Sequence, residues 1–286
     1  MHGLIFVTWE KYLLERFGTK FLDAYRAAIG ETIAMAPLVS RLYDDATLLA
    51  GVGAANKLSG FDVDTLLREY GRYFIVNGLT SHLCAHVLDQ VYSGRDLLLA
   101  MRNVHARLRI TREGLTPPLF DYDFTPHPHE VVLLYDSDRH LCCVLWGAIK
   151  GAAERYGEQV FIVEQACMKQ GAPVCRLVAR FSPPQANTRP WPKTPDQLTR
   201  QQRQRELASL LLYILPEGRP AEGITLTNLQ QILRQRQEIV AHQLRPAVLL
   251  EALQHLQFAG YLATTADLPG DNLTQRRYRR VRPNWE

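Results

Sequence analysis

The stretch VHARLRITREGLTPP, residues Val104–Pro118, decides the fold that we expect for this chain. It carries one histidine, His105, and ends on a proline, Pro118, thirteen residues further along. Apolar residues recur at helical spacing as far as Ile110, and the two adjacent prolines then prevent the helix from continuing. A lone histidine on such a helix is more often a solvated or core side chain than a ligand. Its role therefore depends on the motif that follows.

The motif YDSDR begins seventeen residues after Pro118. Its alternate positions, Tyr135, Ser137 and Arg139, carry two hydroxyls and a guanidinium that share one face of an extended strand. A buried haem requires an axial nitrogen ligand for its iron. It also requires hydrogen-bond donors for two propionate carboxylates, which are costly to bury unpaired. His105 and this polar face supply both, so the sequence predicts a haem site.

The length and composition predict a globular chain of two domains. At 286 residues, with 47% hydrophobic and 22% charged residues, the chain is long enough to form two cores. Five prolines between Ser182 and Thr199 predict an extended linker, because proline cannot continue a helix. We therefore expect a first domain at 1–181, a Pro-rich linker at 182–197 and a second domain at 198–286.

Hydrophobic spacing predicts an α+β fold for the first domain, with N-terminal helices followed by an antiparallel sheet. The expected helices are Glu10–Phe17, Phe21–Gly30, Ala46–Leu58, Asp62–Asn77, Ser81–Tyr92 and Leu97–Ile110. The expected strands are Val131–Tyr135, Gln159–Gln165 and Cys175–Phe181, with a helix at Arg139–Tyr156 after the first of them. Asp62 or Asp64 is a suitable N-terminal cap for the helix that follows it.

The second domain is expected to hold three helices and then two strands, which is the order of a small winged helix-turn-helix. The helices are Leu198–Leu215, Leu226–Arg236 and Pro246–Gly260, and the strands are Tyr261–Thr265 and Arg277–Val281. Proline suits the first helical turn and glycine suits a C-terminal cap, so Pro246 and Gly260 fit the ends of the third helix.

The motifs of the first domain resemble, in their order, the haem nitric-oxide/oxygen-binding family, H-NOX, from Met1 to about Phe181. The resemblance runs through MHGLIFVTWEKYL, YDDATLLAGVGAANKLSGFDVDTLLREYGRYF, NVHARLRITREGLTPPLF, YDSDR and CRLVARF. It implies that the cofactor is haem b, that His105 is the proximal ligand of the iron and that Pro118 presses on the porphyrin. It also implies that Tyr135, Ser137 and Arg139 hold the propionates.

Two further observations concern the pocket and its gas. Near the N-terminus, Ile5 and Trp9 are apolar side chains suited to the wall of a haem pocket. Relatives that hold oxygen stably carry a tyrosine five residues after the arginine, where this chain has Val144. Bound oxygen needs a hydrogen-bond donor, which valine lacks. The resemblance therefore implies a nitric-oxide-selective site, in which NO weakens the bond between iron and His105 and the helix relaxes.

Positive charge is concentrated in the second domain. Residues 200–286 hold twelve arginines, no lysine and eight acidic residues, which accounts for the net charge of +4. Five arginines lie on or beside the last expected strand: Arg276, Arg277, Arg279, Arg280 and Arg282. They are candidate phosphate contacts for a DNA-binding module. Because Pro246–Gly260 has few base-reading side chains, a protein partner is equally open.

The cysteines are odd in number, five, and no export signal precedes them, so we expect free thiols in a cytoplasmic chain. Cys167 and Cys175 flank a Gly-Ala-Pro turn and resemble the end of the distantly related 4-vinyl-reductase-like domain. They are interpreted as small apolar residues, as a redox pair, or as ligands for zinc or an iron–sulfur cluster, although two cysteines are half of what such a site normally needs. We do not expect Cys142 and Cys143 to complete a metal site with them, because adjacent helical side chains diverge by about 100°.

These patterns lead to a sensor hypothesis with two rivals. No apolar run reaches the ~18 residues of a membrane span, and we find no catalytic triad, phosphate-binding loop or dinucleotide fingerprint, so an enzyme is not expected. The first hypothesis is a haem-based nitric oxide sensor whose winged-helix output binds DNA or a protein and which can form a homodimer. The alternatives are a tetrapyrrole-binding assembly adaptor with a protein partner, and a relic of the sensor fold with an empty pocket.

Overall fold

The computed structural model describes residues 1–30, 36–111, 114–182, 195–217, 223–235, 244–258, 261–264 and 276–281. The chain divides into two compact units. The N-terminal unit comprises residues 1–82, 91–102 and 116–190, and the C-terminal unit comprises residues 83–90, 103–115 and 191–286. Two segments that the sequence assigns to the first domain therefore cluster with the C-terminal residues. Of the expected linker at 182–197, residues 183–194 lie outside the described residues.

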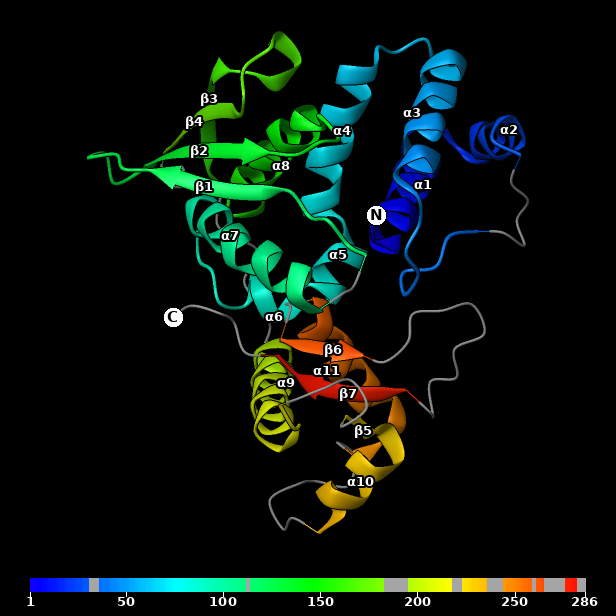
Figure 1. Ribbon diagram of the computed structural model, residues 1–286, viewed down its shortest axis with the longest axis vertical. Coiled ribbons are helices and arrows are strands. Elements are labelled where there is room, and N and C mark those ends of the chain that lie inside the picture. The colour runs from blue at the N-terminus through cyan, green and yellow to red at the C-terminus, as the bar shows by residue number, and fades with distance from the viewer. Residues whose placement is uncertain are drawn as a thin grey trace. The chain divides into compact units, whose positions relative to one another are not determined.

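Helices open the N-terminal unit (Figure 1): α1 Gly3–Phe17, α2 Thr19–Ala28, α3 Asp45–Ser59, α4 Val63–Val76 and α5 Gly78–Leu83. The expected cap of α4 is confirmed, because the Asp62 carboxylate accepts the N–H of Thr65 at 2.8 Å. Helix α1 begins earlier than the expected Glu10, since the residues before Glu10 are too uniformly apolar to show a helical period. The expected helix Ser81–Tyr92 is wrong in extent: the structure has the end of α5 and a short helix α6, Ala85–Leu88.

Aromatic side chains of α1 and α4 form the centre of the helical layer. Trp9 is 1% exposed, and its ring meets Tyr70 edge-on with 5.2 Å between centroids. Its indole N–H donates to the Tyr25 hydroxyl at 3.1 Å. The Tyr70 hydroxyl donates to the Ile5 carbonyl at 2.8 Å. These buried hydroxyl and N–H groups are satisfied, so the aromatic cluster fixes α1 against α4.

An antiparallel sheet follows in the order β1-β2-β4-β3 (Figure 1). Its strands are β1 Leu119–Asp123, β2 Glu130–Asp136, β3 Gln159–Ala166 and β4 Cys175–Ser182. The three expected strands are confirmed as β2, β3 and β4. Strand β1 was not expected, because it is an edge strand with acidic residues and follows two prolines. Helix α8, Cys142–Arg155, connects β2 to β3 and contacts both the sheet and α4.

Helices α4 and α8 approach so closely that two glycines are required at their crossing. A Cβ atom on Gly147 would collide with the Arg68 carbonyl oxygen, and one on Gly71 would collide with the Val144 carbonyl oxygen. We expect Gly147→Ala to lower the free energy of unfolding by about 1–3 kcal/mol, the usual cost of overpacking a core. Urea denaturation followed by far-ultraviolet circular dichroism measures this change. Gly53→Ala on α3 is the control, because a Cβ there meets no atom within 4 Å; equal stability of the two variants would contradict the prediction.

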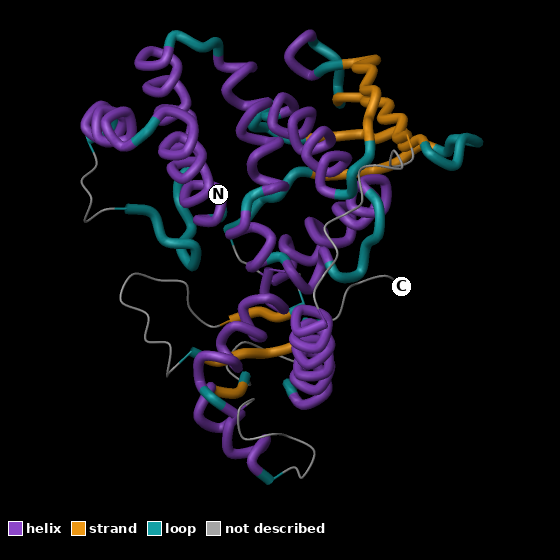
Figure 2. Tube along the Cα trace, turned by 180° about the vertical axis from the view of Figure 1, so that it is seen from behind, coloured by secondary structure: helices purple, strands orange, loops and turns teal. Residues whose placement is uncertain are grey.

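The helix that carries His105, α7 Gly94–Thr111, begins in the N-terminal unit and ends in the C-terminal unit. The rest of the C-terminal unit comprises α6 and the elements α9 Pro195–Ile214, β5 Ile224–Thr225, α10 Leu226–Arg234, α11 Pro246–Phe258, β6 Leu262–Thr264 and β7 Arg277–Arg280. Its antiparallel sheet has the order β5-β7-β6 and lies beside these helices (Figure 2). Fully buried leucines of α9, α10 and α11, among them Leu211, Leu229 and Leu253, form its core.

The expected helices of the second domain are confirmed as α9, α10 and α11, and the expected strands as β6 and β7. Strand β5 was not expected, because two residues are too few to show alternation. Among the described residues, no helix is both long enough and apolar enough to cross a membrane.

Candidate functional site

The predicted polar motif lies where β2 ends. Tyr135 and Ser137 are 4% and 7% exposed, so both hydroxyls are buried. Burial raises the pKa of Tyr135 to about 12, although a hydrogen bond with Ser137 opposes this shift. The Ser137 hydroxyl oxygen also accepts the backbone N–H of Arg139. The structure therefore brings the two hydroxyls together and ties them to the turn that carries the guanidinium.

The Arg139 guanidinium holds a carboxylate in this structure. Its Nε donates to the Asp45 carboxylate at 2.6 Å. Its terminal nitrogens donate to the carbonyl and the hydroxyl of Thr116, just before β1. Burial raises the pKa of Asp45, but hydrogen bonds from Arg139 and from the N-terminal ammonium outweigh it, so the net pKa lies below the ordinary value. A propionate presents the same chemical group as Asp45, so these donors fit the carboxylates of a haem.

The predicted axial ligand and the polar motif fall in different units. His105 lies on the part of α7 that belongs to the C-terminal unit, where it is half-buried. Pro118 is half-buried and precedes β1 in the N-terminal unit, together with Tyr135, Ser137 and Arg139. The structure thus gathers the expected propionate donors within one unit and places the imidazole on the helix that connects that unit to the other.

The side chains expected to line the pocket lie on α1 and α8. Ile5 is half-buried on α1, whereas Trp9 is enclosed by the aromatic cluster and its N–H is used by Tyr25. Val144 is half-buried on α8, and its apolar side chain has no donor to offer.

Two residues of the motif's surroundings were missed by sequence reasoning, Asp45 and Thr116. Asp45 sits in the first turn of α3, where an acidic residue also favours the helix dipole. The only local sequence signal for Asp45 is the doublet Asp44-Asp45. Asp44 alone caps α3, so the second aspartate is not needed for capping.

A sequence model of the haem-NO-binding family matches residues 2–164, which is more than half of the chain. The chain belongs to this family, H-NOX. An H-NOX protein from S. oneidensis in the Fe(II)NO state is 20% identical, with a TM-score of 0.57 over 64% of this chain and 99% of that chain. An oxygen-binding H-NOX domain related to soluble guanylate cyclases is 21% identical, with a TM-score of 0.56 over 68% of this chain and 99% of that chain.

Unliganded Fe(II) H-NOX from K. algicida is 16% identical, with a TM-score of 0.55 over 64% of this chain and 97% of that chain. These likenesses establish the H-NOX fold of helices followed by an antiparallel sheet. No curated protein sequence gives a match. Residues 165–286 lie beyond the family match.

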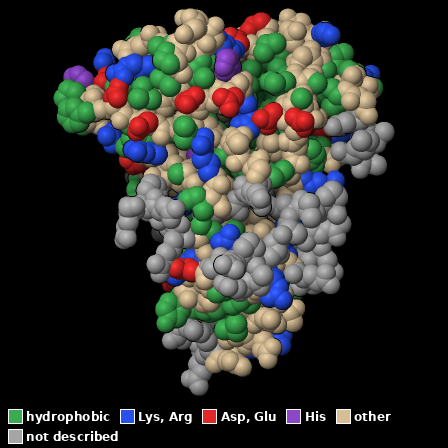
Figure 3. Space-filling view, in the orientation of Figure 1, with side chains coloured by type: hydrophobic (Ala, Val, Ile, Leu, Met, Phe, Trp, Pro, Cys, Tyr) green, Lys and Arg blue, Asp and Glu red, His purple; other side chains and the backbone are tan. Residues whose placement is uncertain are grey.

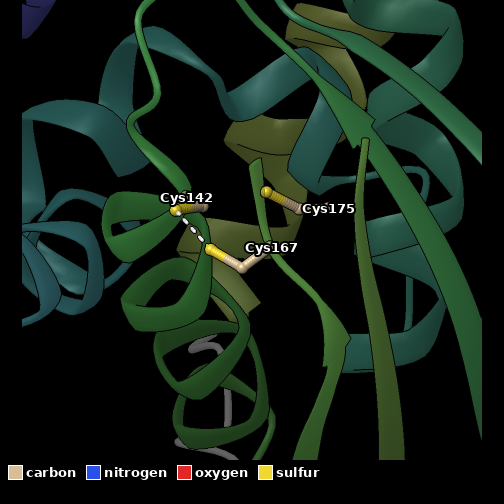
Figure 4. A group of neighbouring side chains, drawn as sticks. All are labelled: Cys142, Cys167 and Cys175. Atoms are coloured by element: carbon tan, nitrogen blue, oxygen red, sulfur yellow. Dashed lines mark hydrogen bonds between the residues drawn. The ribbon is translucent and has the colours of Figure 1, made fainter. Parts of the chain in front are cut away.

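Beside strand β2, the N-terminal unit carries a cluster of three buried thiols, Cys142, Cys167 and Cys175 (Figure 4). Their sulfur atoms lie within 4.8 Å of one another, and Cys142 and Cys167 are 3.7 Å apart. The predicted pair Cys167 and Cys175 is therefore brought together, and Cys142 joins it. Three thiolates are soft donors that suit Zn²⁺, and two neighbouring thiols can be oxidised to a disulfide.

The fourth thiol of this region, Cys143, diverges from the cluster as the helical spacing predicted. Its sulfur lies 3.6 Å from the Lys169 ammonium, which also pairs with Asp64 at 2.6 Å. A hydrogen bond from Cys142 lowers the pKa of Cys143 to about 7; burial opposes this shift, and the charge of Lys169 adds to it. Cys143 is therefore the thiol of this region that we expect to be the readiest thiolate at neutral pH.

Removing the lysine should make Cys143 less reactive. In Lys169→Met the pKa of Cys143 should rise by about one unit, which lowers its thiolate fraction at pH 7 about fivefold. Alkylation by iodoacetamide across pH 6–9, followed by peptide mass spectrometry, measures this change. Lys150→Met on α8 is the control, because Lys150 lies over the Trp146 ring and not beside a thiol. An unchanged alkylation profile in Lys169→Met would contradict the prediction.

The candidate phosphate-binding arginines differ in their surroundings. Arg276 is only 7% exposed, and Arg280 forms an ion pair with Glu217. Arg277 is exposed and donates to the Gly223 carbonyl at 3.1 Å, while Arg279 is half-buried. Arg282 lies outside the described residues. The structure therefore does not present the four described arginines as one row of exposed cations.

Proposed function

We propose that this chain is a haem-based nitric oxide sensor whose C-terminal residues 198–286 form its output module. The observation that carries the proposal is the carboxylate held by Arg139 beside the buried hydroxyls of Tyr135 and Ser137. Membership of the haem-NO-binding family supports it. The sensor hypothesis requires a haem, and these residues offer the donors that its propionates need.

Different residues would hold different parts of haem b. His105 would hold the iron through a ring nitrogen of its imidazole. Tyr135, Ser137 and Arg139 would hold the propionates, and Pro118 would press on the porphyrin. When bound, the haem supplies an iron centre for a small gas. Arg139 would then exchange the Asp45 carboxylate for a propionate or share its donors between them.

The proposed gas is nitric oxide. Stable oxygen binding depends on a donor to the bound oxygen in a dry pocket, and nitric oxide depends on it much less. The apolar Val144 supplies no such donor. We therefore propose a site that forms a stable complex with nitric oxide and none with oxygen.

The proposed output is a winged-helix module. Its described elements follow the order α9, β5, α10, α11, β6 and β7, and its sheet has the order β5-β7-β6; three helices with a small antiparallel sheet support this proposal. We propose a protein rather than DNA as its partner. On α11, the helix that would enter a groove, His255 and Gln257 are buried and Glu251 is held by Gln204. On the face seen in Figure 3, the basic side chains on the described part of this module are scattered and do not form one continuous patch.

An absorption spectrum of the purified full-length chain, loaded with haem, tests the sensor proposal. We expect a Soret band from the ferrous protein that shifts when nitric oxide is added and does not shift stably with oxygen. If the protein takes up no haem, the sensor proposal is wrong, and the alternative of a relic of the sensor fold with an empty pocket holds.

The choice of partner is tested by electrophoretic retardation of duplex DNA at increasing salt. We expect weak binding, with a Kd above about 10⁻⁶ M at physiological salt. Tighter binding that falls steeply with salt and is lost in Arg277→Ala/Arg279→Ala would assign DNA as the partner instead.

A further inference from the structure

Tyr261 ties together the elements of the C-terminal unit. It lies between α11 and β6, and its N–H donates to the Leu256 carbonyl at 2.9 Å. Its own carbonyl accepts the N–H of Val281, at the end of β7, at 3.0 Å. A displacement of Tyr261 would therefore act on the last turn of α11 and on both of these strands at once.

Two side chains contact the ring of Tyr261, one from α7 and one from α6. The Arg107 guanidinium carbon lies over the ring, 3.9 Å from its centroid. The His86 imidazole of α6 meets the ring edge-on, with 5.5 Å between centroids. Residues 83–90, 103–115 and 191–286 belong to the same compact unit, so these contacts lie within it. Among the described residues, the buried Nε of Arg107 has no hydrogen-bond acceptor, so no hydrogen bond at that nitrogen holds the guanidinium in place of the stacking on Tyr261.

Arg107 and His105 lie on nearly opposite sides of one rigid helix. Residues two positions apart in an α-helix, as His105 and Arg107 are, are separated by about 200° around the helix axis. Both belong to α7, which runs without a break from Gly94 to Thr111. A shift or rotation of α7 that begins at the His105 imidazole is therefore transmitted to the Arg107 guanidinium with little loss.

We propose that the Arg107–Tyr261 contact passes the state of His105 to the output module. The inference rests on the proposed function, because it takes His105 as the ligand of the haem iron. If gas binding changes the position of α7, Arg107 stacks on Tyr261 in one state and is displaced in the other. The stacking free energy then differs between the two states, and such a difference is what couples two sites. The α11–β6 junction is the element that responds.

Hydrogen exchange followed by mass spectrometry tests this proposal on the full-length, haem-loaded chain with and without nitric oxide. In the wild type we expect exchange of peptides covering residues 246–264 to change about fivefold or more on gas binding, the smallest factor typical of coupled sites. In Arg107→Gln the change should fall below about twofold, while the Soret shift with nitric oxide stays normal. Arg102→Gln is the matched control, because this arginine of α7 forms an ion pair with the exposed Asp121 and should respond as the wild type does.

Two variants of the tyrosine separate transmission from folding. Tyr261→Phe keeps the aromatic ring and should keep the response, whereas Tyr261→Leu removes the ring and should lose it. The contact is also tested without haem: in the haem-free chain, Arg107→Gln should speed exchange at residues 261–264 about fivefold, because a half-buried cation–π contact is lost.

The outcomes distinguish this inference from the proposed function. If the wild-type chain shows no Soret response to nitric oxide, the proposed function fails and this inference fails with it. If the Soret band responds normally but exchange at residues 246–264 does not, or if Arg107→Gln keeps the full gas-dependent change, only this inference is overturned.

Discussion

His105→Ala should lose haem. We expect the purified variant, supplied with haem during expression, to carry less than about a tenth of the wild-type haem and to lack the ferrous Soret band of an imidazole-ligated iron. The reason is that second-shell changes alone cost 10–100-fold in metal affinity, so loss of the ligand itself should cost about 100-fold or more. Haem content by the pyridine haemochrome method and the absorption spectrum measure the result.

A rescue experiment separates loss of the ligand from loss of the fold. In His105→Gly, free imidazole should enter the space left by the side chain and restore the Soret band, because it supplies the same nitrogen donor. His127→Ala is the matched control, since His127 is an exposed histidine in the loop between β1 and β2. Wild-type haem content in His105→Ala would show that another side chain binds the iron.

The sequence was most informative where local patterns coincide with what the fold needs. The spacing of Tyr135, Ser137 and Arg139 predicted one face of a strand, but β2 ends at Asp136, so Ser137 and Arg139 lie in the turn that follows it; the two hydroxyls are nevertheless buried together. The sequence also correctly predicted the Asp62 cap and, from their hydrophobic periods, helices α3, α4 and α8. These features depend on residues close together in sequence, so no knowledge of the tertiary structure was required.

The sequence-based prediction was wrong where a helix is buried on several sides, because its residues then show no hydrophobic period. The residues that open α1 are apolar almost throughout, so no face could be assigned to them, and the helix was expected to begin too late. The partner of Arg139 was missed for another reason: Asp45 is 94 residues away in sequence, and nothing in its own neighbourhood distinguishes it from a capping residue.

The compact units illustrate the same limit at a larger scale. The prolines after Ser182 indicated a boundary between domains, and a boundary of composition is all that a local pattern can give. That α6 and the end of α7 cluster with residues 191–286 depends on contacts such as Arg107 on Tyr261. Contacts between residues so far apart in sequence leave no trace in the spacing of either segment.

Arg139→Leu should weaken haem binding and the fold together. Without the guanidinium, one propionate and the Asp45 carboxylate both lose a charged donor. We expect haem affinity to fall about 10–100-fold. The free energy of unfolding of the haem-free chain should fall by about 1–2 kcal/mol. This effect is small because Asp45 is 36% exposed, so solvent screens the ion pair. Haem transfer to apomyoglobin and urea denaturation measure the two effects.

The pH dependence of the loss identifies its cause. Arg139 holds the pKa of Asp45 below the ordinary value of 3.8, so the stability that the pair contributes is complete above that pH and is lost as pH falls through the folded-state pKa. The difference in stability between the wild type and Arg139→Leu should therefore shrink below about pH 4. A difference that is constant with pH would mean that Arg139 acts through packing and not through its charge.

Conservative and surface substitutions make the interpretation specific. Arg139→Lys keeps the charge but loses the planar fork, so its haem affinity should lie between those of the wild type and Arg139→Leu. Arg72→Leu removes an arginine whose partner, Glu154, is as exposed as itself, and an ion pair of that kind contributes less than about 1 kcal/mol. If Arg72→Leu weakened haem binding as much as Arg139→Leu, the effect would come from net charge and the polar motif at the end of β2 would not be a propionate site.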